Sequence, residues 1–199
     1  MKIKSVEFVK GVTSINALPP GNLPEIAFAG RSNVGKSSMM NTLLGRQKLA
    51  KVSKTPGRTR EMNFFIINEC AHFVDLPGYG FARAAGAVRA LWAPVILRYL
   101  SEREQLQAVV LILDVRRTPN DEDLALVDLL RDYGVSTIVV ANKCDKLPLQ
   151  QRQKQIRIIS EALNLLPHDI LQFSSLSGAG RDKMWQVLDM FIKAEQKAE

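Results

Sequence analysis

A glycine-rich stretch, GRSNVGKSS, follows the apolar run EIAFAG and precedes a stretch with helical periodicity. From Gly30 to Ser37 it fits the pattern G-x-x-x-x-G-K-[ST]. In such a loop, glycines let successive backbone N–H groups point at one phosphate, and the start of the following helix adds positive potential. Lys36 supplies a point charge, and the hydroxyl of Ser37 can bind magnesium. The stretch therefore predicts a loop that binds the phosphates of a nucleotide.

The tetrapeptide DLPG closes another apolar run, AHFVD, and Tyr79 follows it. Proline and glycine at these positions are typical of a surface turn. At a strand end beside a phosphate-binding loop, however, Asp75 can hold magnesium through water, and the Gly78 N–H can contact a terminal phosphate. We therefore expect residues 75–78 to open and close with that phosphate, as a switch.

The tetrapeptide NKCD, residues 142–145, follows the apolar run STIVVA and indicates which base is bound. The carboxylate of Asp145 can accept hydrogen bonds from N1–H and the N2 amino group of guanine, whereas adenine offers an unprotonated N1. Polar mismatches of this kind can discriminate by about 10⁴-fold. The aliphatic stem of Lys143 can lie across the purine. Taken alone, the tetrapeptide also fits a solvated loop.

The segment FSSLSGAG adds a backbone N–H near Ser175 that can bond the guanine O6. Four such motifs in this order predict a guanine-nucleotide-binding P-loop protein. ATPases and small-molecule kinases share the first motif but have no use for NKxD.

Six apolar runs can form the strands that position these motifs, with helical patterns between most of them. The gap between the runs NFFIIN and AHFVD is too short for a helical crossover, so these two should form a hairpin while the others run parallel. We expect a three-layer α/β fold of the Ras-like P-loop type. Its six-stranded, mainly parallel sheet has one antiparallel strand and helices on both faces. The motifs then share the carboxyl edge of the sheet, where ligands bind. The six runs are EIAFAG, NFFIIN, AHFVD, AVVLILD, STIVVAN and DILQFS.

The composition of the chain, 46% hydrophobic and 24% charged over 199 residues, fits one globular domain. We expect residues 1–22 to form an N-terminal arm packed on a domain of residues 23–195. One apolar helix face between Val88 and Leu100 should include Trp92 in the core. The two cysteines lack metal-ligand spacing. No apolar run approaches the roughly 18 residues of a membrane span, and none has the form of a signal peptide, so we expect no stable membrane association. We also expect the protein to be cytoplasmic and monomeric.

The net charge of +7 is concentrated near the N-terminal third, because the segment from Arg31 to Arg60 contains no acidic residue. This basic segment is either a solvated loop or a surface for phosphate, whether of a nucleotide, an RNA backbone or anionic lipid. The absence of interleaved aromatic residues leaves these alternatives open. The cations that crowd its second half are Arg46, Lys48, Lys51, Lys54, Arg58 and Arg60.

These motifs resemble those of the EngB (YihA/YsxC) family, which belongs to the TrmE-Era-EngA-EngB-like P-loop GTPases. The residues that carry the resemblance are PEIAFAG, GRSNVGKSS, KTPGRTR, DLPGYGFA, NKCD and FSS. The resemblance implies GTP hydrolysis to GDP and phosphate, assembly of the large ribosomal subunit, and a need for the protein in cell division and septation. The chain departs from the family pattern in two places: Arg60 stands where Gln is usual, and NKCD replaces the more frequent TKxD.

The resemblance also implies that Thr59, in the first switch, contacts magnesium and the terminal phosphate of GTP. In Ras-like enzymes the residue after DxxG is a glutamine that orients water, and a phenol cannot reproduce its paired donor and acceptor. Tyr79 therefore predicts slow intrinsic hydrolysis. Asn33 resembles the asparagine that binds a monovalent cation in potassium-stimulated relatives. Its alternative role is an ordinary hydrogen bond within the P-loop.

Residues of all these motifs are expected to form the site. Lys36, Thr59, Gly78 and Asn33 are expected to act on the reaction, and Ser37, Thr59 and, through water, Asp75 to hold Mg²⁺. A membrane-associated signalling GTPase and a P-loop small-molecule kinase are the alternative functions. The residues expected to contact the nucleotide are Gly30, Arg31, Ser32, Asn33, Val34, Gly35, Lys36, Ser37, Ser38, Gly57, Arg58, Thr59, Asp75, Leu76, Pro77, Gly78, Asn142, Lys143, Asp145, Ser174, Ser175 and Leu176.

Overall fold

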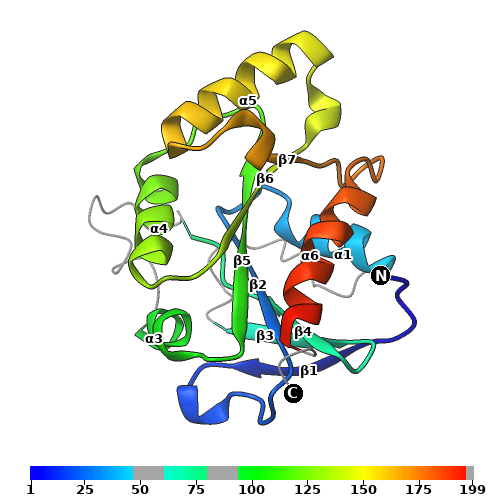
Figure 1. Ribbon diagram of the computed structural model, residues 1–199, viewed down its shortest axis with the longest axis vertical. Helices are drawn as coiled ribbons and strands as arrows, with labels where there is room; N and C mark the ends of the chain where they lie inside the picture. Colours follow the sequence, from blue (N-terminus) through cyan, green and yellow to red (C-terminus); the bar gives the residue numbers. More distant parts are fainter. Residues whose placement is uncertain (47–60, 80–93, 196–199) are drawn as a thin grey trace.

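A computed structural model describes residues 1–46, 61–79 and 94–195 (Figure 1). Its sheet has the strand order β1-β3-β4-β2-β5-β6-β7. β3 runs antiparallel to both of its neighbours, and the other neighbouring pairs are parallel, which confirms the expected hairpin and mainly parallel sheet. The strands are β1 (Val6–Val12), β2 (Glu25–Gly30), β3 (Met62–Ile67), β4 (Ala71–Asp75), β5 (Leu106–Asp114), β6 (Thr137–Asn142) and β7 (Leu171–Gln172).

Strand β1 is the seventh strand, and the six expected apolar runs account for the others. It lies within the segment assigned to an N-terminal arm, and its sequence VEFVKGV exposes most of its residues. Backbone pairing with β3 holds it, together with an edge contact of 5.5 Å between the ring centres of Phe8 and Phe65. The side chain of Asn68 also accepts hydrogen bonds from the Lys4 and Ser5 amides. An edge strand half exposed to solvent lacks the apolar run of a central strand. The boundary at residue 22 stays a prediction.

The helices lie on both faces of the sheet, as expected (Figure 1). One core cluster packs α3, α4 and α5 against the sheet, and the other packs α1 and α6. The described part of the helix expected over Val88–Leu100 begins at Pro94, and Trp92 lies outside the described residues. None of the described helices combines the length and hydrophobicity that a bilayer crossing requires. The helices are α1 (Lys36–Leu44), α3 (Pro94–Glu102), α4 (Asp121–Asp132), α5 (Leu149–Leu163) and α6 (Arg181–Glu195), with short 3₁₀ turns at Ile15–Ala17, Cys144–Lys146 and Pro167–Asp169.

The central strand β2 is buried along its whole length, between β4 and β5. Its side chains alternate between the two core clusters, with Ala27 and Ala29 in one and Ile26 and Phe28 in the other. Strands covered on both faces read as continuous apolar runs, and EIAFAG is such a run. Parallel neighbours bring the carboxyl ends of β2, β4, β5 and β6 to one edge, which positions the motifs that follow them.

A buried carboxylate closes the opposite end of β2. Glu25 is fully buried and accepts hydrogen bonds from the Tyr99 hydroxyl at 2.9 Å and from Arg103, whose nearer nitrogen is 2.6 Å away. Arg103 also donates to the carbonyl of Pro19 at 3.0 Å, which ties the segment before β2 to the end of α3. Burial lowers the pKa of the neighbouring His72 despite the charge of Glu25, which opposes that shift. The network therefore anchors β2 at the end away from the motifs.

The substitution Arg103→Ala tests this anchor. It would leave the Glu25 carboxylate buried without its cation, and breaking a buried pair in this way costs about 3–5 kcal/mol of the free energy of unfolding. Arg98→Ala, in α3 shortly before Arg103, is the matched control, because the side chains of Arg98 and its partner Glu102 are both 57% exposed. We expect the control to change the free energy by about 0.5 kcal/mol or less. Urea unfolding measures both, and equal losses would show that Glu25 does not depend on Arg103.

Candidate functional site

The glycine-rich loop connects the end of β2 to the start of α1. Asn33 and Gly35 both have left-handed backbone conformations, with φ of 69° and 96°. A Cβ built on Gly35 would lie 2.6 Å from Nδ2 of Asn142, so the backbone passes the end of β6 too closely for any side chain. The carbonyl of Gly35 then accepts from the Met39 amide at 2.8 Å and begins the helix. The loop therefore has the tight curl that its sequence predicts.

Lys36 and Asp75 meet at the centre of the site. The Lys36 ammonium donates to a carboxylate oxygen of Asp75, which ends β4 and is 9% exposed. Ser37 follows Lys36 in the first turn of α1. Within the described residues there is no cluster of three His, Cys, Asp or Glu side chains. One hydroxyl and one carboxylate fit Mg²⁺, which keeps several waters and shares phosphate oxygens.

The DLPG loop lies against the glycine-rich loop. Leu76 and Pro77 are buried, whereas Gly78 is exposed. A Cβ built on Gly78 would lie 3.5 Å from the Gly30 carbonyl and from both the amide nitrogen and hydroxyl of Ser32. The Ser32 amide donates to the carbonyl of Tyr79 at 3.2 Å. The two loops predicted to meet a terminal phosphate are thus in contact with each other.

The side chain of Tyr79 lies in the core. Only 3% of the residue is exposed, and its hydroxyl donates to Oδ1 of Asp123 at 2.7 Å. Burial and the Asp123 charge raise the pKa of Tyr79 well above its usual value, so the phenol remains a donor at neutral pH. The sequence indicated only that Tyr79 is a poor substitute for a water-orienting glutamine. Its contact with α4 was missed, because Asp123 lies 44 residues away in the chain.

Asn142 joins two of the loops. It is fully buried at the end of β6, and its side-chain amide donates to the Val34 carbonyl at 3.0 Å. Its oxygen accepts from the amide and hydroxyl of Ser175, at 3.3 and 3.1 Å. One side chain thereby connects the glycine-rich loop to the segment after β7.

Lys143 is held over the glycine-rich loop by two acceptors. Its backbone is left-handed, with φ of 64°, and its ammonium donates to the Asn33 carbonyl at 2.5 Å and to Asp114 at 2.9 Å. Burial would raise the pKa of Asp114, but hydrogen bonds from Arg116 and Lys143 hold it well below its usual value. Sequence reasoning missed Asp114. The one feature of the sequence that could have indicated Asp114 is its position at the end of the apolar run AVVLILD, which reaches the same edge of the sheet.

Asp145 stands in the short turn after β6. Its Oδ1 accepts from the Ser174 hydroxyl at 2.6 Å, and this hydrogen bond is the main cause of its lowered pKa. The carboxylate is therefore ionised at neutral pH, as an acceptor of two guanine N–H groups must be. Leu176, two residues after Ser174, is 78% exposed.

The structure brings most of the expected residues to one edge of the sheet. Residues 30–38, 75–78, 142–145 and 174–176 come from the ends of β2, β4, β6 and β7. Gly57, Arg58 and Thr59 lie outside the described residues, and of the six cations that crowd the basic segment only Arg46 lies within them.

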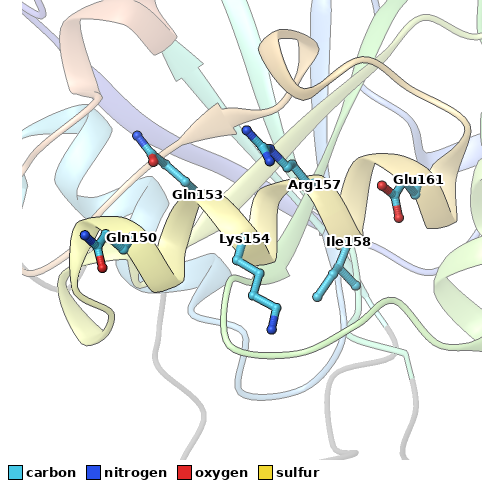
Figure 2. Close-up of a pocket in the computed structure, with 6 residues that line it drawn as sticks. All are labelled: Gln150, Gln153, Lys154, Arg157, Ile158 and Glu161. Carbon is cyan, nitrogen blue, oxygen red and sulfur yellow. The ribbon is translucent and has the colours of Figure 1, made fainter.

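A groove of about 330 Å³ lies along α5, and none of its lining residues belongs to the expected nucleotide site (Figure 2). Gln153 and Arg157 line one side of the helix in this view, and Lys154 and Ile158 the other. Its charges are mixed, since Glu161 accompanies the two cations. We do not assign it to the nucleotide site.

Known proteins resemble this chain over nearly all of its length. The sequence profile of a family described as 50S ribosome-binding GTPase matches residues 25–143. The probable GTP-binding protein EngB of Citrifermentans bemidjiense is 48% identical over 192 residues, which cover 96% of this chain and 90% of that protein. The chain belongs to the EngB family of GTPases. The family's probable GTP-binding protein EngB of Bacillus cytotoxicus is 43% identical over 98% of this chain and 99% of its own.

Solved structures agree with the EngB fold. A crystal structure of a probable GTP-binding protein EngB covers 85% of this chain and 99% of its own, with a TM-score of 0.67 and 24% identity. A variant of Aquifex aeolicus Era bound to GDP and AlF₄⁻ matches with a TM-score of 0.66 and 25% identity, over 86% of this chain and 57% of its own. The expected three-layer GTPase fold is confirmed.

Gly35→Ala tests the close approach between the glycine-rich loop and Asn142. The new Cβ would meet Nδ2 at 2.6 Å and break the hydrogen bond to Val34, in addition to straining a left-handed backbone. Gly134→Ala is the matched control, because Gly134 has φ of 68° and a Cβ added there would meet nothing within 4 Å. We expect the control to cost about 1 kcal/mol and Gly35→Ala about 1–3 kcal/mol more, measured by urea unfolding. Equal costs would mean that Asn142 moves aside freely.

Proposed function

We propose that this GTPase is a nucleotide-switched assembly factor for the large ribosomal subunit, needed through that role for normal cell division and septation. The observation that carries the proposal is the match of residues 25–143 to a family described as 50S ribosome-binding GTPase. The excess positive charge, +7 overall, supports an RNA-rich partner, since phosphate contacts dominate affinity for nucleic acid. A ribosomal partner would place the protein in the cytoplasm.

The phosphates of GTP would lie on the glycine-rich loop, at the start of α1, where Lys36 meets Asp75 at the edge of the sheet. Ser37, Asp75 through water, and Thr59 would hold Mg²⁺. When bound, the ion neutralises charge on the phosphates during transfer to water. Lys36 contributes a second positive charge, and the Gly78 amide a hydrogen bond to the terminal phosphate.

The guanine base would lie between Lys143 and the segment after β7. Asp145, held by Ser174, accepts from N1–H and the N2 amino group. The stem of Lys143 covers the purine face, because its ammonium is held by Asp114 and the Asn33 carbonyl. A backbone N–H near Ser175 and the side chain of Leu176 complete the pocket.

Hydrolysis would be slow without a further group, because the Tyr79 phenol lies in the core and cannot orient water at the phosphate. Asn33 is exposed on the glycine-rich loop. We propose that it binds K⁺ beside the phosphates, where the ion offsets developing negative charge.

Turnover in potassium and in sodium tests the role of Asn33. The wild-type protein should hydrolyse GTP at least several-fold faster in KCl than in NaCl at equal ionic strength, and Asn33→Ala should lose this difference. GDP affinity, measured in parallel, controls for damage to the loop. Identical rates of hydrolysis in the two salts would show that K⁺ does not contribute to the reaction.

Sedimentation with large ribosomal subunits tests the assembly role. We expect co-sedimentation in the presence of a non-hydrolysable GTP analogue and release with GDP, because the basic segment that contains Thr59 would present an RNA-binding surface only when GTP is bound. Binding should also weaken as salt is raised. Equal binding with the analogue, GDP and no nucleotide would contradict a nucleotide-switched factor.

A further inference from the structure

Two of the contacts of residue 79 are hydrogen bonds that point in different directions. Its carbonyl accepts from the Ser32 amide at 3.2 Å, and its hydroxyl donates to Asp123 at 2.7 Å. The first contact joins the DLPG loop to the glycine-rich loop, and the second joins it to α4. The position of the DLPG loop therefore depends on α4 as well as on β4.

The acceptor on α4 is fixed in place. Asp123 is 3% exposed and is the third residue of the helix, where it forms a capping box with Asn120. Oδ2 of Asp123 accepts from the Asn120 amide at 3.0 Å, so its other oxygen can accept from Tyr79. Beside it, Glu122 pairs with Arg31 of the glycine-rich loop at 3.4 Å. The first turn of α4 thus contacts both phosphate-facing loops.

The contact between the loops occupies groups that a terminal phosphate requires. The Ser32 amide is bonded to the Tyr79 carbonyl, and the backbone at Gly78 packs against Gly30 and Ser32. A phosphate oxygen between these loops would need an N–H···O distance of about 2.9 Å on each side. In the proposed site, a terminal phosphate bound by the Ser32 amide would displace the Tyr79 carbonyl from it, whereas a diphosphate, which lacks that phosphate, would not.

We propose that the hydrogen bond between Tyr79 and Asp123 is a latch that holds the DLPG loop on the glycine-rich loop and thereby favours GDP over GTP. Tyr79 and Asp123 are positioning residues in this account, since neither touches the nucleotide. The proposal rests on the nucleotide site described under Proposed function. The latch gives the Tyr79 side chain a role in holding the DLPG loop, which its position after DLPG in the sequence does not suggest.

Tyr79→Phe tests the latch, because it removes the hydroxyl and keeps the buried ring. The dissociation constants of GDP and of a non-hydrolysable GTP analogue are measured for each variant. Buried hydrogen bonds to charged groups are strong enough to shift an equilibrium by about tenfold or more. We expect the ratio of the two constants to move about tenfold toward the analogue, with GDP affinity changed less than threefold.

Tyr99→Phe is the matched control, since Tyr99 is also buried and donates to a carboxylate, Glu25, at 2.9 Å. Its partner Glu25 begins β2, at the end of the strand away from the site, so the substitution should destabilise the fold similarly and leave the ratio unchanged. Asp123→Asn keeps one oxygen for the capping contact and weakens the bond to Tyr79. It should shift the ratio in the same direction by a smaller factor.

Four outcomes are decisive. An unchanged ratio in Tyr79→Phe, or a shift toward GDP, would overturn the latch, and so would an equal shift in Tyr99→Phe. Wild-type protein that binds neither nucleotide would instead refute the proposed site itself. GDP binding by the wild-type chain therefore separates failure of the latch from failure of the site.

Discussion

The site depends on the close packing of the glycine-rich loop against the end of β6. Only a glycine at position 35 lets the loop backbone approach Asn142, and Asn142 in turn holds the Val34 carbonyl and the segment at Ser175. Asn142 is fully buried and therefore loses its hydrogen bonds to water on folding. The hydrogen bonds to Val34 and Ser175 take their place. The loop proposed to bind the phosphates and the segments proposed to bind the base thus share one polar side chain.

Ionic contacts lie at opposite ends of the sheet and have different roles. At the site edge, Asp114 holds Lys143 over the loop, and Lys36 meets Asp75, so the charges face positions where a nucleotide would lie. At the other end, Glu25 binds Arg103 and Tyr99 entirely within the protein. Strand β2 runs between these contacts and is anchored through Glu25, so it would stay in place during the proposed movement of the DLPG loop.

The sequence could predict the elements in which a short motif combines particular residue types at a particular spacing. Gly35, Lys36 and the NKCD tetrapeptide are of this kind, because a phosphate or base imposes both residue type and spacing. Strand β1 was missed because its pairing with β3 stabilises a segment without a continuous apolar run. The contacts of Asp114 with Lys143 and of Tyr79 with Asp123 join residues far apart in the chain, and single-sequence patterns carry no information on such pairs.

The convergence of these loops on one guanine nucleotide is the central claim, and hydrogen exchange tests it most directly. Exchange of backbone amides would be followed by mass spectrometry with and without saturating GDP. The structure predicts added protection in peptides covering residues 30–38, 142–145 and 174–176, and little change along the α5 groove residues Gln150 to Glu161. Protection concentrated on the α5 groove, or absent from residues 142–145, would contradict the account.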